Sequence, residues 1–205
     1  MNLIFASNNP HKLKEVKNIV GDDYSISGLQ DVGIEEDIKE TADSLEGNAQ
    51  IKADFVYQKV GQPCFADDTG LEVFALNMRP GVMSARYAGN NKSSWDNVKK
   101  LLFEMKNISN RKARFRTVIC LILQGKHYFF EGAVEGEIAT TPAGHKGFGY
   151  DPVFIPDGYQ CTFADMNDAD KNQISHRARA LNKMAAFLNK MSNYSQQRRN
   201  GAKIR

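Results

Sequence analysis

Short apolar runs alternate with helical repeats along the chain, and this pattern predicts a mixed α/β protein. Strands are predicted where apolar or alternating residues run together and end in polar turns, at residues 3–6, 24–29, 63–66, 71–74, 113–123 and 127–133. Helices are predicted where apolar residues recur every three or four positions, at residues 10–20, 44–56, 94–105 and from 175 to about 188. The polar or glycine-rich segments 34–41, 80–91 and 142–151 are predicted to be loops.

The order of these elements favours one continuous domain. Residues 113–123 and 127–133 flank the turn Gln124-Gly125-Lys126, which predicts a hairpin of two long strands. We find no internal repeat, low-complexity segment or linker in the 205 residues. The sequence therefore predicts a single domain over residues 1–191, followed by a basic polar tail, residues 192–205, that is expected to be disordered.

The net charge of +3 suggests nucleic-acid binding, but its position along the chain argues against it. The last fourteen residues carry no acid and four basic residues, Arg198, Arg199, Lys203 and Arg205. Removing these four from the 27 Lys and Arg residues leaves 23, against 24 Asp and Glu residues. Because a nucleic-acid binder usually carries its positive charge on one face of the folded body, we expect no nucleic-acid partner.

The sequence also predicts a cytoplasmic protein without a membrane span. The longest apolar run, Val118–Leu123, has six residues, far short of the roughly 18 needed to cross a bilayer. The first residues lack the basic segment of a secretory signal. The three cysteines, Cys64, Cys120 and Cys161, are far apart and fit neither a disulfide framework nor a CxxC metal site.

A first polar cluster follows the predicted strand at residues 3–6 and opens the first helix. It consists of Ser7, Asn8, Asn9, Pro10, His11 and Lys12. Because free N–H groups at a helix N-terminus bind anions, a hydroxyl, amides and a lysine at this point favour a phosphate site. The spacing is not that of a GxxxxGK[ST] P-loop. The alternative is a simple polar N-cap with a solvated lysine.

A second cluster, Asp67-Asp68-Thr69-Gly70, follows the predicted strand 63–66. Successive strand side chains face opposite sides, so we expect one of the two carboxylates to face a shared site. Carboxylates at the end of a buried strand require cations or a metal ion as partners. The alternative is a turn in which an aspartate caps its own backbone.

A third cluster could recognise a planar ligand. In the loop Phe148-Gly149-Tyr150-Asp151-Pro152, two aromatic rings and an acid could stack on a nucleobase and accept hydrogen bonds from its edge. The alternative is that the rings fill the core.

The last cluster lies where the final helix begins. Ser175 is a good N-cap, which places His176 and Arg177 in the first turn, with Lys171 just before it. Cations there oppose the helix dipole, and this favours a compensating anion or polar ligand.

Taken together, the clusters resemble those of the inosine triphosphatase family, pyrophosphatases of nonstandard purine nucleoside triphosphates. The matching motifs follow one another in order from Leu3 to about Leu188. They are Ser7-x-Asn9-x-x-Lys12, Glu40-Thr41 to Lys52, Asp67 to Leu71, Ser84 to Gly89, Phe148 to Pro152, and Lys171 with Ser175-His176-Arg177. Lys39 stands where relatives often carry a second acid.

The resemblance implies hydrolysis of ITP, dITP or XTP to the monophosphate and pyrophosphate with Mg²⁺. It implies that Asp68 is the general base and that Glu40 and Asp68 hold the metal. The substrate-binding residues it implies are Ser7, Asn8, Asn9, Pro10, His11, Lys12, Lys52, Thr69, Phe148, Gly149, Tyr150, Asp151, Lys171, His176 and Arg177.

The same resemblance implies an elongated, twisted mixed β-sheet flanked by helices, with two lobes around a central cleft, and a homodimer. Two other functions stay open. One is a Maf-type pyrophosphatase of pyrimidine or modified nucleotides, and the other is a nucleotide-binding module without turnover. The Phe-Gly-Tyr-Asp and Ser-His-Arg segments favour purines, and paired acids near phosphates argue against simple binding.

Overall fold

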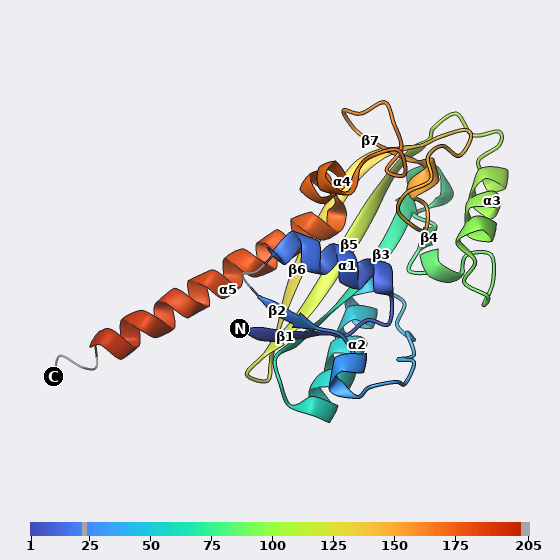
Figure 1. The fold of residues 1–205 in the computed structure, drawn as a ribbon. Helices are drawn as coiled ribbons and strands as arrows, with labels where there is room; N and C mark the ends of the chain where they lie inside the picture. Colours follow the sequence, from blue (N-terminus) through green and yellow to red (C-terminus); the bar gives the residue numbers. More distant parts are fainter. Residues whose placement is uncertain (22–23, 202–205) are drawn as a thin grey trace.

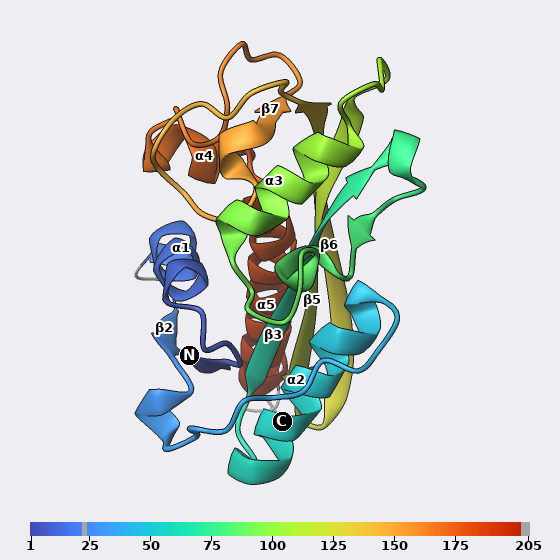
Figure 2. The ribbon, with the colours of Figure 1, turned by 90° about the vertical axis from the view of Figure 1, so that its right-hand side faces the viewer.

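The fold is an elongated mixed sheet with helices packed on both of its faces (Figures 1 and 2). The structure, a computed structural model, describes residues 1–21 and 24–201. Its strands are β1 (Asn2–Phe5), β2 (Ser25–Ser27), β3 (Cys64–Val73), β4 (Pro80–Gly81), β5 (Lys112–Leu123), β6 (Lys126–Ile138) and β7 (Phe154–Pro156). Its α-helices are α1 (Pro10–Val20), α2 (Leu45–Val60), α3 (Ser94–Glu104), α4 (Asp168–Ile174) and α5 (His176–Gly201).

The sheet combines parallel and antiparallel pairing, as the family resemblance implies. Its strand order is β2-β1-β3-β5-β6-β7, with β4 paired to β3. β1 is parallel to both of its neighbours, and the remaining pairs are antiparallel. Alternate residues of β3 and β5 face opposite sides, so Phe65 and Ile119 pack toward α1 and α5, whereas Cys64 and Cys120 pack toward α2.

β3 is longer than the sequence predicts. We expected a strand to end at Asp67 and a second to begin at Leu71, and this prediction is wrong. Every residue from Cys64 to Val73 pairs with β5, so the polar stretch between them is held by the same ladder of hydrogen bonds. Gly70 is required within it, because a Cβ there would lie 2.6 Å from the carbonyl oxygen of Gly81. Asp67 and Asp68 therefore belong to a strand and not to a turn.

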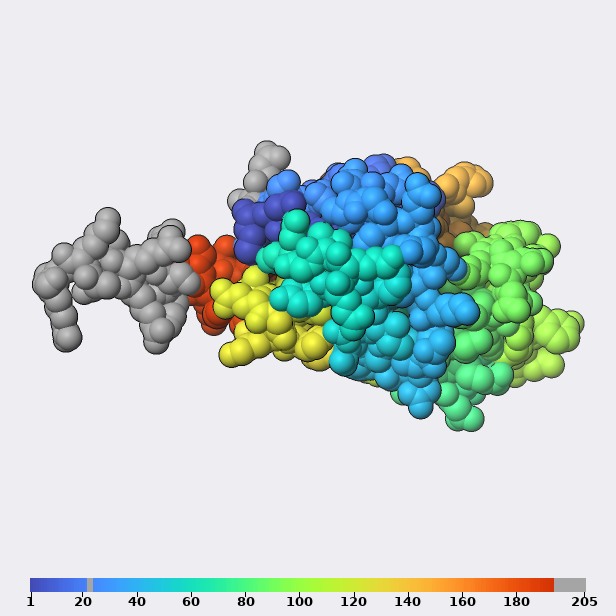
Figure 3. All heavy atoms as spheres, turned by 90° about the horizontal axis from the view of Figure 1, so that it is seen from below, coloured from blue at the N-terminus to red at the C-terminus, as the bar shows by residue number. Residues whose placement is uncertain are grey.

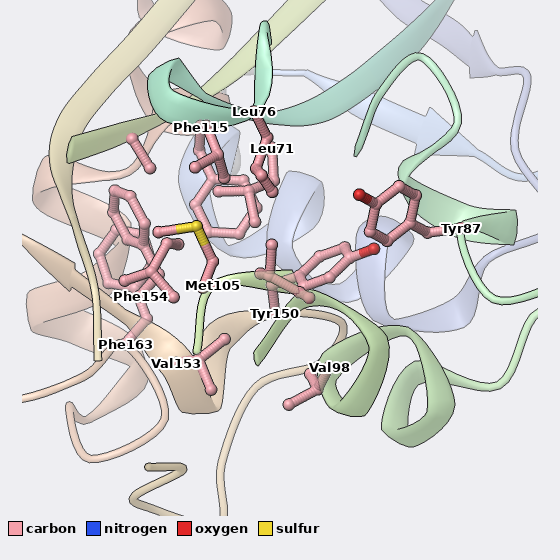
Figure 4. Close-up of a cluster of buried hydrophobic side chains, with 14 of the residues drawn as sticks. Leu71, Leu76, Tyr87, Val98, Met105, Phe115, Tyr150, Val153, Phe154 and Phe163 are labelled. Atoms are coloured by element: carbon pink, nitrogen blue, oxygen red, sulfur yellow. The ribbon is translucent and has the colours of Figure 1, made fainter. Parts of the chain in front are cut away.

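Two lobes share this sheet. In the first, β1 and the adjoining ends of β3 and β5 lie between α2 and the pair α1 and α5. In the second, the other ends of β3, β5 and β6 pack with α3 and β7 around Phe115, Phe154 and Phe163 (Figure 4). Tyr150 also belongs to this second core, and its hydroxyl donates to the carbonyl oxygen of Ser84 at 2.9 Å.

The predicted helices are all present, and the sequence analysis missed α4 and the short strands β4 and β7, of which β4 lies in the predicted loop 80–91. α5 continues to Gly201 and extends away from the body (Figure 1), so it includes residues 192–201 of the segment assigned to a tail. In Figure 3 the coloured part of α5, in red, lies at one end of the elongated body. Residues 202–205 of that segment lie outside the described residues. The division into a domain and a tail stays a prediction. No helix within the described ranges is long and apolar enough to cross a membrane.

Candidate active site

One cavity of about 530 Å³ lies between the two lobes. The lining includes every residue that the resemblance assigns to catalysis, metal or substrate, namely Ser7, Asn8, Asn9, Pro10, His11, Lys12, Glu40, Lys52, Asp68, Thr69, Phe148, Gly149, Tyr150, Asp151, Lys171, His176 and Arg177. They come from segments up to 170 residues apart in sequence. The fold therefore brings the four predicted clusters to a single place.

At one end of the cavity stands the N-terminus of α1. Asn9 is its N-cap, and the side-chain oxygen of Asn9 accepts hydrogen bonds from the backbone N–H groups of His11 and Lys12 at 3.0 and 3.2 Å. The alternative of a simple polar N-cap required a solvated Lys12, but the Lys12 ammonium is paired and largely buried. It lies 2.9 Å from Asp67 Oδ1, with only 14% of the side chain exposed.

The two adjacent aspartates of β3 have different environments. Asp67 lies beneath the cavity, where Oδ1 pairs with Lys12 and Oδ2 with the Arg177 Nε at 3.0 Å. Burial alone would raise the pKa of Asp67, but the cations of Lys12 and Arg177 hold this pKa well below its usual range. Asp67 is therefore a permanently charged partner for two cations.

Asp68, one residue further, faces the cavity. Its carboxylate accepts hydrogen bonds from Lys52 Nζ at 3.1 Å and from Asn48 Nδ2 at 3.2 Å. Burial raises the pKa of Asp68, and the nearby Glu40 carboxylate raises it further against the opposing effect of Lys52. A carboxylate with a raised pKa that opens on a cavity is suited to accept a proton.

Lys52 joins Asp68 to a second carboxylate. Its ammonium lies 2.7 Å from Glu40 Oε1, while the Arg86 guanidinium contacts Glu40 Oε2 at 2.8 Å. Within the described part of the chain, no group of three or more His, Cys, Asp or Glu side chains could hold a metal ion. The donor set nevertheless fits Mg²⁺, which takes one or two carboxylates and completes its shell with water and phosphate oxygens.

The other end of the cavity holds a buried charged network. Lys171 Nζ lies 2.8 Å from both Asp151 Oδ2 and Glu15 Oε1, and Arg177 contacts the second oxygen of Glu15. Burial would lower the pKa of Lys171, but the carboxylates of Asp151 and Glu15 raise it. The backbone N–H of Phe148 also donates to Asp151 Oδ2, at 2.8 Å, which fixes the loop to this network.

His176 lies beside this network as a neutral ring. It is 4% exposed and stacks on Phe115 with ring centroids 4.6 Å apart. Burial first, and then the charges of Arg177 and Lys171, lower its pKa well below the usual value. Its Nδ1 is buried and has no hydrogen-bond partner in the part of the chain that the structure describes. Both ends of the cavity thus carry cations and carboxylates, but only the second end also has aromatic rings, those of Phe115, Phe148 and His176.

Comparison with known proteins identifies the family. Residues 3–187 match the model of the Ham1 family. The chain belongs to the Ham1 family. Many relatives of this chain carry the name dITP/XTP pyrophosphatase. This confirms the resemblance to the inosine triphosphatases that the motifs indicated.

Relatives and solved structures of the Ham1 family match nearly the whole chain. A protein of Porphyromonas gingivalis named dITP/XTP pyrophosphatase is 55% identical over 187 residues, which are 91% of this chain and 96% of the relative. One of Bacillus subtilis with the same name is 43% identical over 90% of this chain and 96% of its own length. The solved Ham1 protein of Staphylococcus aureus has a TM-score of 0.84 and 40% identity, and the match covers 93% of this chain and all of that one.

Besides Asp67, three described residues of this Ham1 family chain hydrogen-bond through their side chains to charged residues of the candidate site, although they were absent from the predicted set. They are Glu15, which contacts Lys171 and Arg177; Asn48, which contacts Asp68; and Arg86, which contacts Glu40. On the helical pattern, Glu15 is an ordinary polar position of α1, and nothing in its spacing distinguishes it from the exposed Lys14. Asn48 and Arg86 lie within the matched motifs, so the motifs were the signal that could have found them.

Proposed function

We propose that this protein hydrolyses nonstandard purine nucleoside triphosphates, namely ITP, dITP and XTP, to the monophosphate and pyrophosphate. One observation carries the proposal: a carboxylate with a raised pKa, Asp68, shares a cavity with a cationic phosphate end and an aromatic end. The relatives named dITP/XTP pyrophosphatase support it. The reaction belongs to the hydrolases that act on acid anhydrides.

Catalysis would combine charge neutralisation with proton transfer. Lys12, Lys52 and the α1 N-terminus bind the phosphate chain and neutralise its charge. Asp68 accepts the proton of the attacking water at a carboxylate oxygen, which its raised pKa favours. Glu40 and Asp68 would hold Mg²⁺, which when bound neutralises phosphate charge and orients the triphosphate. Arg86 and Lys52 keep the Glu40 carboxylate beside that of Asp68.

The other end of the cavity would select the base. Phe148 supplies a ring for stacking, and Arg177 and the free Nδ1 of His176 lie nearby. We assign Arg177 as the donor to the 6-oxo group of hypoxanthine or xanthine and Asp151 or adjacent backbone as the acceptor for N1–H. Adenine presents a donor and an acceptor at these two positions, so both contacts would be lost.

A panel of nucleotides tests the proposal. Purified protein with Mg²⁺ is expected to release pyrophosphate from ITP, dITP and XTP, with far slower release from ATP and from pyrimidine triphosphates. Preference for pyrimidine or modified nucleotides would instead indicate the Maf-type activity. Binding of ITP without any release of pyrophosphate would indicate a binding module.

We also propose that the chain acts as a cytoplasmic homodimer without a nucleic-acid partner. The family resemblance supports the dimer. Light scattering coupled to size exclusion is expected to give about twice 23.0 kDa. A mass of one chain at every concentration from nanomolar to micromolar would contradict it.

A further inference from the structure

The His11 side chain lies against an aromatic ring of the opposite lobe. The ring centroids of His11 and Phe148 are 5.4 Å apart and their planes differ by 23°, so the two rings are stacked. His11 is the second residue of α1, and Phe148 lies in the middle of the loop 142–151. The imidazole makes no hydrogen bond or ion pair with any described residue. Stacking on Phe148 is therefore its specific contact within the described chain.

This pair is not part of a core. His11 is exposed and Phe148 is half-buried. Both rings line the main cavity, and both also line a second hollow of about 580 Å³ bordered by α1 and α4. The stacked pair therefore lies between the main cavity and the second hollow. The rings have room to separate because each of these spaces adjoins both of them.

The two rings are held in different ways. α1 holds His11, and its first turn is fixed by the Asn9 cap. Phe148 lies between Gly147 and Gly149, whose φ angles are +71° and +64°. Such angles suit glycine, and the backbone of Phe148 is held by its N–H donation to Asp151 Oδ2. The rings therefore separate by rotation of the Phe148 side chain about its own χ angles, while α1 and the loop backbone stay in place.

We propose that His11 and Phe148 form an aromatic clamp that opens to receive the purine ring of the substrate between them. This inference rests on the proposed function and assigns His11 to the base and not to the phosphate end of the site. In the free protein each ring covers the apolar face of the other, and the purine replaces that contact with two stacking contacts. Lys12, the next residue, points instead to Asp67, so adjacent residues of α1 serve the two ends of the nucleotide.

The clamp is tested by binding of inosine monophosphate, measured by titration calorimetry, in parallel with ITP kinetics. Loss of one base–aromatic stack typically weakens binding by about 5- to 100-fold. We expect His11→Ala to raise the Kd of inosine monophosphate and the KM of ITP by about tenfold, with kcat within about twofold. His11→Phe, which keeps a ring, should stay near wild type. Lys17→Ala, at an exposed position of the same helix that lines neither hollow, is the matched control.

Inorganic tripolyphosphate, which has no base, separates the two ends of the site. Its inhibition constant should be the same in wild type and His11→Ala. An unchanged Kd for inosine monophosphate in His11→Ala overturns the clamp, and so does an equal loss of tripolyphosphate binding. If the wild-type protein binds inosine monophosphate but releases no pyrophosphate from ITP, the proposed function is contradicted but the clamp is not. The titration with inosine monophosphate still decides the role of His11 in that case.

Discussion

Asp67 and Asp68 show how one peptide bond separates two electrostatic environments. Strand alternation directs Asp67 to Lys12 and Arg177 and Asp68 to Lys52 and the cavity. Burial acts on both, yet the pKa of Asp67 is lowered and that of Asp68 raised, because two cations contact the first carboxylate and one contacts the second. The sequence predicts that only one of the pair faces the site.

The two aspartates should respond differently to the same substitution. Asp68→Asn is expected to lower kcat by at least about 10²–10⁴-fold, because it removes the proton acceptor and a ligand of the proposed metal. Asp67→Asn should keep far more activity but lose about 3–5 kcal/mol of stability, since it leaves the buried Lys12 without its ion-pair partner and leaves Arg177 with Glu15 alone. Steady-state kinetics and thermal unfolding measure both effects. Equal loss of turnover in the two variants would contradict the assignment.

The ionised carboxylates of Asp67 and Asp68 should contribute to the stability of the fold with opposite signs at neutral pH. The folded pKa of Asp67 lies below its unfolded value, so its contribution to stability is present above the unfolded value and is lost as the pH falls toward the folded pKa. The folded pKa of Asp68 lies above its unfolded value, so its ionisation costs stability at neutral pH. Asp68→Asn should therefore unfold at the same or a higher temperature than wild type at pH 7.5, and a clearly lower Tm would contradict this.

The pH dependence of kcat/KM should be bell-shaped. Activity requires ionised Asp68, so the acidic limb should lie above the usual aspartate pKa of 3.8. Burial and the neighbouring cations Lys52 and Arg177 lower the pKa of Lys12, so loss of its charge should set an alkaline limb below 10.5. Lys12→Arg should move that limb upward, because arginine keeps its charge. An alkaline limb that stays in place would exclude Lys12 as its source.

Arg177 should control discrimination between bases. Two lost hydrogen bonds at roughly 1–3 kcal/mol each predict a wild-type preference for ITP over ATP of about 10²–10⁴-fold. Arg177→Ala should reduce this ratio by about tenfold or more. The ratio of kcat/KM values is measured on one preparation, so any loss of folded protein cancels from it. A ratio equal to that of wild type would show that another group selects the base.

At the scale of elements, α1 contributes to both ends of the cavity. Its N-terminus and Lys12 face the phosphate end, while His11 and Glu15 contact the loop 142–151 and the network of Lys171 and Arg177. The helix itself was predictable, since Pro10, the apolar repeat and Gly21 define its ends. The contact of Glu15 with Lys171 and Arg177 was not predictable, because the burial of one polar position of a helix depends on which residues pack against it in the folded protein.

The loop 142–151 depends on a glycine beside its network. A Cβ at Gly147 would lie 2.1 Å from Asp151 Oδ2, at a φ of +71° that other residues rarely adopt. Gly147→Ala should therefore displace the Asp151 carboxylate from Lys171 and from the Phe148 N–H, and raise the KM of ITP by about tenfold. Gly158→Ala, with a φ of +86° and open space around it, is the control for backbone strain alone. An equal KM in the two variants would contradict this role.

At the scale of the molecule, the sequence predicts the mixed sheet, the helices and the membership of all four clusters in one site. It does not predict that β3 runs unbroken through Asp67–Gly70. These residue types favour turns by themselves, and pairing with β5, which keeps them in a strand, cannot be seen from the local sequence. It also treats Phe148 and Tyr150 alike, with both rings either stacking on a ligand or filling the core. The structure places Tyr150 in the second core, where its hydroxyl bonds Ser84, and stacks Phe148 on His11 instead.

The unbroken β3 has a thermodynamic consequence. A cleft between lobes usually suggests two units that melt separately, but here β3, β5 and β6 pass through both lobes and pair along their length. Neither lobe can lose its sheet without breaking the ladder of the other, so unfolding should be cooperative across the cleft. Differential scanning calorimetry is expected to give one transition whose calorimetric and van't Hoff enthalpies agree per folding unit. Two resolved transitions would show that the lobes fold independently.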